Sequence, residues 1–212
     1  KMLIITEASR TMVFKAAEIL EKADKGDTEA QKIFRIITPL IKFRACRDVR
    51  KIAGDAMEIR GGSGYIEEWL DPKILRDAHL GSIWEGTSNI ISLDTIRAIK
   101  KDDNIYVLKN FLINSVQERS IKENEKVLLS TIDDVFNFVF QEINDDYASS
   151  SRQITSLLYY LCSAVFLNSE SYCCTTLSHR KKISELIIKY KISENNPLQR
   201  NEIDFKLVDE YL

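Results

Sequence analysis

Residues 28–60, TEAQKIFRIITPLIKFRACRDVRKIAGDAMEIR, decide the fold class of this chain. Within them Phe34, Ile37, Ile41 and Ala45 recur at the three- and four-residue intervals that place side chains on one face of a helix. A run of 33 residues with this period is long for a helix in a small domain. The stretch therefore predicts one long helix over its whole length.

The flanking sequence continues the helical pattern in both directions. Residues 1–25 predict a helix whose apolar stripe contains Val13, Ala16, Ala17 and Leu20, and Gly26 with Asp27 separates it from the long helix. All seven glycines lie at or before position 86, and Pro197 is the single proline beyond it, so little in the second half breaks a helix. We expect an all-α fold, an up-down helical bundle with an additional C-terminal helical region.

The C-terminal half predicts four helices, at about 105–119, 121–144, 151–168 and 170–192. Breaks are expected at 147–151 and at 168–171, where polar residues cluster. Several apolar positions at helical spacing predict packing on a partner surface or in the core, namely Leu128, Ile132, Val135, Phe136, Val139, Phe140, Tyr159, Tyr160 and Phe166. We therefore divide the chain into a bundle over 1–101 and a helical extension over 102–212.

Composition and charge exclude several classes of protein. With 212 residues, 44% hydrophobic and 29% charged, the chain has the composition of an ordinary globular protein. The net charge is −2, with +1 in residues 1–103 and −3 in the remainder, so the global charge gives no pull toward nucleic acid. No apolar stretch approaches the ~18 residues of a membrane span, so we expect no membrane segment. The spacing of the four cysteines and two histidines predicts reduced intracellular thiols and no metal site.

The stretch Trp84-Glu85-Gly86-Thr87-Ser88-Asn89 is the strongest candidate for chemistry. It places a carboxylate beside a large aromatic side chain, followed by hydroxyls at the predicted start of a helix of about thirteen residues. An apolar neighbour suits a general base, and the free N–H groups of a helix start suit phosphate or carbonyl oxygens. The alternative is a solvated Glu85 that complements the helix dipole, with Thr87 or Ser88 as an ordinary cap.

Residues 60–65, RGGSGY, form a second glycine-rich segment. Glycines here end the long helix because they tolerate positive φ. A dinucleotide-binding loop would need a preceding strand, which the helical pattern excludes. From the residues alone the segment predicts a turn.

Three blocks in order carry a resemblance to a known family. They are AMEIRGGSGY at 56–65, LRDA at 75–78 and IWEGTSNI at 83–90. Together they resemble the C-terminal helical domain of the acyl-CoA dehydrogenases, and the resemblance covers about residues 1–101. The residues of these blocks and the long helical tail look most similar to the AidB-like branch of that family.

The resemblance assigns roles to the block at residues 85–89. Glu85 falls on the family's catalytic glutamate, which removes the α-proton of an acyl-CoA while the β-hydrogen leaves as hydride to the flavin of FAD. Gly86 matches a substrate-contacting glycine. Thr87, Ser88 and Asn89 match positions that contact the flavin cofactor.

The resemblance also implies an oligomer. Five residues match the segment that reaches the flavin nucleotide of a neighbouring subunit in a homodimer or homotetramer: Glu58, Ile59, Arg60, Gly61 and Gly62. Glu58 stands where many members have glutamine, and a carboxylate repels a pyrophosphate, so we expect its backbone to make the contact. Some branches place the base near the start of the first helix of this domain, where this chain offers Glu7 as an alternative to Glu85.

Family members carry an N-terminal helical domain and a middle β-domain in addition to this bundle. We therefore expect the chain to be the C-terminal part of a longer protein and to be inactive alone. An electron-acceptor protein would be a further partner, and the location would be the cytoplasm, or the mitochondrial matrix in a eukaryote.

Two other functions remain for the tail. One is nucleic-acid binding in a stress-response protein, against which its net negative charge argues. The other is a structural or oligomerisation role, which its apolar stripes favour. The basic residues at 178–182 are expected to form a solvated helix face.

Overall fold

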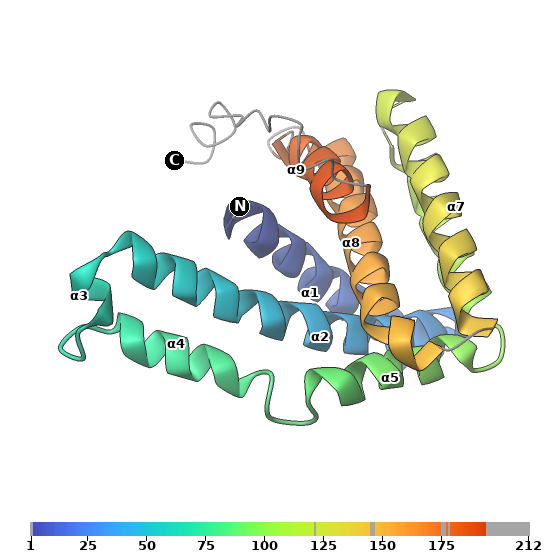
Figure 1. Ribbon diagram of the computed structural model, residues 1–212. Coiled ribbons are helices and arrows are strands. Elements are labelled where there is room, and N and C mark those ends of the chain that lie inside the picture. The colour runs from blue at the N-terminus through green and yellow to red at the C-terminus, as the bar shows by residue number, and fades with distance from the viewer. Residues whose placement is uncertain (1, 121, 145–146, 175–176, 178, 194–212) are drawn as a thin grey trace.

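Residues 2–120, 122–144, 147–174, 177 and 179–193 are described by the computed structural model, and every regular element among them is helical (Figure 1). The all-α prediction is therefore confirmed. The elements are α1 (Met2–Asp24), α2 (Thr28–Ile59), α3 (Gly62–Tyr65), α4 (Asp71–Leu80), α5 (Ser88–Lys100), α6 (Asn104–Glu118), α7 (Lys122–Asn144), α8 (Tyr147–Cys173), α9 (His179–Ile187) and a π-helical turn, η2 (Ile188–Ile192).

The long helix α2 organises the first half of the molecule. Its start is capped by Asp27, whose side chain accepts a hydrogen bond from the Ala30 N–H at 3.0 Å. Helix α1 precedes it as one arm of a helical hairpin, and α4 returns along α2 on the other side (Figure 1). Helix α5 then crosses under α2, so that α2 contacts α1, α4 and α5 at once.

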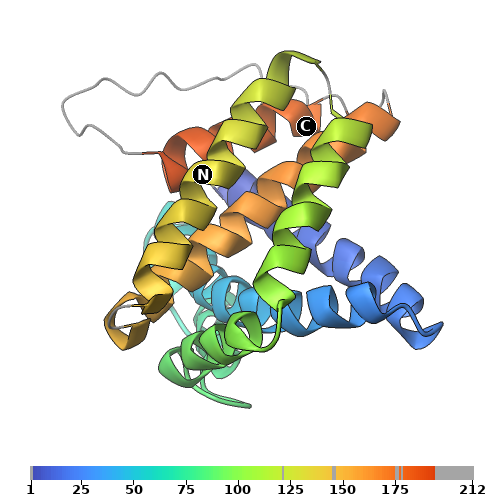
Figure 2. The same ribbon diagram turned by 90° about the vertical axis from the view of Figure 1, so that its right-hand side faces the viewer.

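Helix α8 is the centre of the second half. It packs against α1, α2, α5, α6, α7 and α9, and Figure 2 shows it running behind α6 and α7. Tyr159, Tyr160 and Phe166 are buried, as predicted. The predicted stripe of α7 is also buried from Leu128 to Val139, with Phe140 half-buried beside it. One continuous apolar cluster joins these side chains to those of α1 and α2.

The predicted break at residues 168–171 is wrong, because α8 continues to Cys173. The polar side chains there find partners without interrupting the helix. Asn168 Nδ2 donates to Ser120 Oγ at 2.9 Å, and Ser169 Oγ donates to the Val165 carbonyl at 3.0 Å. The helix also begins at Tyr147, inside the other predicted break. These polar residues therefore lie within α8 and bond to the connection between α6 and α7 and to their own helix.

The predicted apolar stripe of α1 is also wrong in part. Ala16 is buried, whereas Val13, Ala17 and Leu20 are exposed. The buried face of α1 is instead built from Ile5, Glu7, Ala8, Thr11, Met12, Ala16, Ile19 and Ala23. Helix α1 carries apolar residues on two stripes, and periodicity alone does not say which of them faces the core.

The basic cluster at 178–182 is not a solvated face throughout. Arg180 is buried, and its guanidinium pairs with Glu170 and with Glu7, the latter at 3.1 Å. Ser178 lies outside the described residues. Arg180 therefore fastens α9 to α1 and α8, a role that the sequence did not indicate.

Within the described part of the chain, no helix combines the length and the apolarity that a membrane crossing requires.

Candidate functional site

The loop between α4 and α5 holds the candidate base on an unusual backbone. Glu85 has φ +57° and Gly86 has φ +110°, so two successive residues occupy the left-handed region. A non-glycine residue with positive φ costs free energy unless its surroundings fix it, and such residues cluster at functional sites. The local chain therefore presents the Glu85 side chain outward at the cost of some backbone strain.

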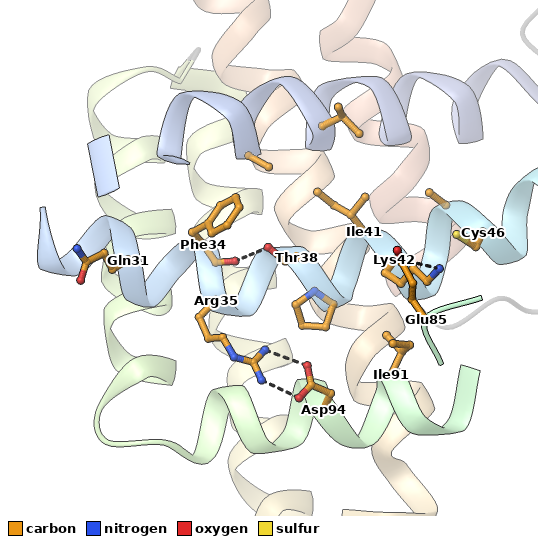
Figure 3. A pocket seen from close by; sticks show the side chains of 14 residues that line it. Gln31, Phe34, Arg35, Thr38, Ile41, Lys42, Cys46, Glu85, Ile91 and Asp94 are labelled. Atoms are coloured by element: carbon orange, nitrogen blue, oxygen red, sulfur yellow. Dashed lines mark hydrogen bonds and ion pairs between the residues drawn. The ribbon is translucent and has the colours of Figure 1, made fainter. Parts of the chain in front are cut away.

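Glu85 lies at the rim of a groove of about 750 Å³ between α1, α2 and α5 (Figure 3). Its side chain is 85% exposed, and its Oε2 lies 3.6 Å from Nζ of Lys42 on α2. The groove lining is mainly apolar and includes Val13, Phe34, Ile41 and Ile91. A carboxylate at the edge of an apolar surface is a suitable place for proton transfer.

A second ion pair closes the opposite part of the groove. Arg35 donates two hydrogen bonds to Asp94, at 2.9 and 2.6 Å (Figure 3). Bidentate geometry of this kind is rigid, whereas the single contact of Lys42 with Glu85 is not. The pair ties α5 to α2 and leaves Glu85 as the more loosely held charge of the site.

The predicted flavin contacts lie directly after Glu85 at the start of α5. Thr87 occupies the cap position in an extended conformation, and its side chain makes no capping hydrogen bond. Ser88 and Asn89 follow in the first turn, where the backbone N–H groups have no partner within the helix. The structure thus places the three predicted residues together, with donor groups at a helix start.

Asn89 also has a partner that sequence reasoning missed. Arg152 of α8 donates from Nε to Asn89 Oδ1 at 2.7 Å, and one helical turn away Ser92 and Ser151 share a hydrogen bond of 3.2 Å. Asn89 and Arg152 are 63 residues apart in the chain, so no local sequence pattern could have indicated their contact. The tail therefore touches the candidate site.

The glycine-rich segment lies at the other end of α2. Arg60 ends the helix, and Gly61 follows with φ +58°, a turn that glycine makes at low cost. Arg60 pairs with Asp71 at 3.0 Å and lies over the ring of Trp69. Sixteen residues of helix separate Glu58 from Lys42, which corresponds to about 24 Å. The structure does not bring Glu58, Ile59, Arg60, Gly61 and Gly62 together with Glu85.

Large apolar side chains near both ends of the site face outward. Ile59 is 77% exposed, Tyr65 80% and Trp84 61%. Leu70 and Ile83 are exposed as well. Clusters of exposed apolar side chains mark surfaces that other protein segments or ligands cover.

The alternative base Glu7 has a different environment. It is 3% exposed and is held by Arg10 at 2.7 Å and by Arg180 at 3.1 Å. Both arginines neutralise a carboxylate that has no opening to the groove lining. Glu7 is therefore part of the ion-pair network that joins α1 to α9.

Together the fold and the site define an α-helical module with an outward carboxylate at the start of a helix. Residues 1–100 match the family model of the acyl-CoA dehydrogenase C-terminal domain. The match covers the same part of the chain over which the three sequence blocks resemble this family.

The relatives agree with this assignment. The chain is 34% identical over 130 residues to acyl-CoA dehydrogenase family member 11 of Caenorhabditis elegans, an alignment that covers 60% of this chain and 21% of that protein. It is 32% identical over 108 residues to AidB of Escherichia coli K12, covering 51% of this chain and 20% of that protein. The chain thus spans about one fifth of the length of these relatives.

The fold also matches a solved structure. The crystal structure of Caenorhabditis elegans ACDH-11 in complex with C11-CoA superposes with a TM-score of 0.76 at 22% identity. The match covers 89% of this chain and 34% of that one. The similarity therefore extends beyond residue 100 into the helical tail.

Proposed function

We propose that this chain is the C-terminal part of a flavin-dependent acyl-CoA dehydrogenase, in which Glu85 is the catalytic base. The reaction would introduce a double bond between the α and β carbons of an acyl-CoA thioester. The single observation that carries the proposal is the position of Glu85, exposed on left-handed backbone directly before the α5 start, in a segment of this family. A relative in fold with bound C11-CoA supports the substrate class.

Glu85 would remove the α-proton of the thioester. Its carboxylate is free of tight hydrogen bonds among the described residues, since its ionic partner there, Lys42, lies 3.6 Å away. A base must turn toward the proton that it takes, and a long ion pair permits this movement. Lys42 would hold the carboxylate at the rim of the groove between turnovers.

The start of α5 fits a flavin cofactor. Acyl-CoA dehydrogenases are generally FAD-dependent, and the flavin supplies the hydride acceptor for the β-hydrogen. The uncapped hydroxyl of Thr87 and the N–H groups of Ser88 and Asn89 would donate hydrogen bonds to its oxygens. Gly86, with φ +110°, would let the backbone approach the substrate closely.

The segment from Glu58 to Gly62 would serve a second subunit. Arg60 is engaged by Asp71 and does not neutralise Glu58, so a pyrophosphate would be met by backbone N–H groups and not by the Glu58 carboxylate. The distance of about 24 Å along α2 supports contact with another subunit's flavin. The exposed Ile59 and Tyr65 would be covered in that homodimer or homotetramer.

The tail would support the bundle and not bind nucleic acid. Helix α8 is buried in the shared core, and residues 104–212 carry a net charge of −3. Nucleic-acid affinity depends on clustered Lys and Arg that contact phosphates. An electron-acceptor protein would complete the reaction of the whole enzyme.

The test is flavin bleaching by acyl-CoA. The whole protein, saturated with FAD and kept anaerobic, is mixed with saturated acyl-CoAs of increasing chain length while the flavin absorbance is followed. We expect bleaching in the wild type and a rate lower by about 10²-fold or more in Glu85→Gln, since a general base contributes at least this much.

Glu68→Gln is the matched control, because Glu68 is also exposed and lies outside the proposed site. This variant should bleach at the wild-type rate. If the FAD-loaded wild type never bleaches, or if Glu85→Gln bleaches as fast as Glu68→Gln, the proposal is wrong.

A further inference from the structure

Four arginines gather where α2, α8 and the start of α5 meet. Arg44, Arg47 and Arg50 lie on α2, and Arg152 reaches them from α8. We call these four residues the arginine cluster. Burial of the Arg47 guanidinium lowers its pKa, and the like charges of Arg44, Arg152 and Arg50 lower it further. Arg47 is therefore close enough to each of the other three arginines to be repelled by it.

Among the residues that the structure describes, acidic groups near the arginine cluster are too few to balance it. Asp48 is the carboxylate that attracts Arg47, but Arg44 already holds it from the next turn of α2 through both carboxylate oxygens. Asp48 also accepts a hydrogen bond from the Tyr160 hydroxyl at 3.3 Å. One carboxylate thus serves Arg44 and Tyr160, and the charges of the other three arginines remain.

The remaining three arginines have neutral partners or none. Arg47 lies over the ring of Phe43 at 5.3 Å, and Arg152 donates to Asn89. The Nε of Arg50 is buried and has no hydrogen-bond partner in the part of the chain that the structure describes. A buried donor without a partner, beside half-buried guanidiniums that lack a carboxylate of their own, is costly unless an anion joins them.

We propose that the arginine cluster is a binding site for a small phosphate-bearing anion of the pyrophosphate class. Guanidinium groups match phosphate oxygens in geometry and form paired, charge-assisted hydrogen bonds with them. Arg47, Arg50 and Arg152 supply the donors, and Asn89 adds the amide of a side chain that Arg152 already fixes. The Arg44 pair with Asp48 holds the α2 side of the site in place.

A compact anion fits better than a nucleic acid. Duplex or single-stranded nucleic acid needs a row of exposed cations along its backbone. Arg44, Arg47 and Arg50 are instead half-buried, and only Arg152 is exposed. The arginine cluster is thus suited to one or two phosphate groups that enter between the helices.

This site shares Asn89 with the proposed flavin contacts, but it can be tested apart from the proposed catalysis. It requires neither Glu85 nor a bound flavin, and its anion can be measured on the 212-residue chain itself. The experiment is a calorimetric titration of the folded chain with inorganic pyrophosphate at low salt, with ADP and single-stranded DNA in parallel. We expect saturable pyrophosphate binding that weakens with salt, and a rise in Tm on binding.

Variants locate the site. Arg47→Gln and Arg152→Gln should each weaken pyrophosphate binding by about tenfold or more, the effect of losing a hydrogen bond to a charged group. Without ligand, Arg47→Gln should keep or raise the Tm, because it relieves repulsion within the cluster. Arg97→Gln on the exposed face of α5 removes the same charge elsewhere and should bind as the wild type does.

The outcomes separate the explanations. Equal affinity for ADP and pyrophosphate would show that the site recognises the phosphate groups alone. Tighter binding of ADP would show that it recognises a nucleotide. Both results support the site. Thr87→Ala, which removes a proposed flavin contact, should leave pyrophosphate binding unchanged. Absence of saturable binding, equal loss in Arg97→Gln, or binding of DNA in place of pyrophosphate would overturn the inference.

Discussion

Two regions of the molecule use the same kind of residue in opposite ways. Around α8, Leu158, Tyr159 and Phe166 are sealed in the core, whereas Ile59, Tyr65 and Trp84 on the site side stand in the open. The buried set lies in the middle of a helix that is buried on all sides from Leu158 to Asn168, and the exposed set lies at helix ends and in a loop. The difference teaches that large apolar residues at helix ends and in loops mark a surface for ligands and partners, and not a local core.

The largest expected difference between the two regions is tested by replacing one leucine in each region with alanine. Leu158→Ala in α8 should lower the free energy of unfolding by about 2–5 kcal/mol, because it removes buried methyl groups and leaves a cavity. Leu70→Ala on the site side should change it by less than about 0.5 kcal/mol, since Leu70 is 70% exposed. Urea unfolding of the 212-residue chain measures both. Similar losses in the two variants would contradict the comparison.

The next effect concerns the ion pairs that join the two regions. Arg180→Ala leaves Glu7 and Glu170 without their buried partner and should cost about 2–3 kcal/mol, somewhat less than a fully orphaned buried pair because Glu7 keeps Arg10. Chemical denaturation provides the measurement. Arg97→Ala on exposed α5 is the control and should cost little. Equal costs would show that the buried network does not fasten α9.

Two glycines should respond with opposite signs. Gly86→Ala should destabilise by about 1–3 kcal/mol, because φ is +110° and the new Cβ would lie 3.2 Å from Ile91 Cδ1. Gly54→Ala in the interior of α2 should stabilise by about 0.5–1 kcal/mol, because its Cβ meets nothing within 4 Å. Thermal unfolding compares them directly. A stabilising Gly86→Ala would mean that the loop before α5 is not held as described.

The last comparison concerns a pH dependence at alkaline pH. Burial raises the pKa of Tyr159 to about 12, from 10.0, and also raises that of Tyr160. The folded state therefore keeps protons that the unfolded state releases, so this contribution is complete below pH 10 and is lost as the pH rises toward 12. Tyr159→Phe should flatten the decline in stability, whereas Tyr65→Phe at an exposed position should leave it as in the wild type. An unchanged slope in Tyr159→Phe would contradict the burial of this hydroxyl.

The helices of the tail and their buried faces could be predicted from the sequence where a helix carries a single apolar stripe. In α7 the apolar period gave the buried face directly, from Leu128 to Val139. In α1 two stripes compete, and tertiary packing chose Ile5, Met12 and Ile19 over Val13 and Leu20. Local composition also failed at residues 168–171, because hydrogen bonds to Ser120 and to the backbone of α8 itself satisfied polar groups that resemble a loop signal.

Only the part of the candidate site that is contiguous in the sequence could be predicted. Residues 85–89 are contiguous, so their placement at the start of α5 followed from capping and glycine signals. Lys42 and Arg152 come from other helices, and their contacts with Glu85 and Asn89 exist only after folding. The pattern of apolar and polar residues within one segment does not indicate contacts between distant segments.

The most direct test of the central claim is α-proton exchange. An acyl-CoA analogue that cannot be oxidised is incubated in D2O with the FAD-loaded whole protein, and deuterium at the α carbon is followed by mass spectrometry. We predict exchange with the wild type and with Glu68→Gln, and exchange slower by about 10²-fold or more with Glu85→Gln. Exchange at the wild-type rate in Glu85→Gln would show that another group is the base.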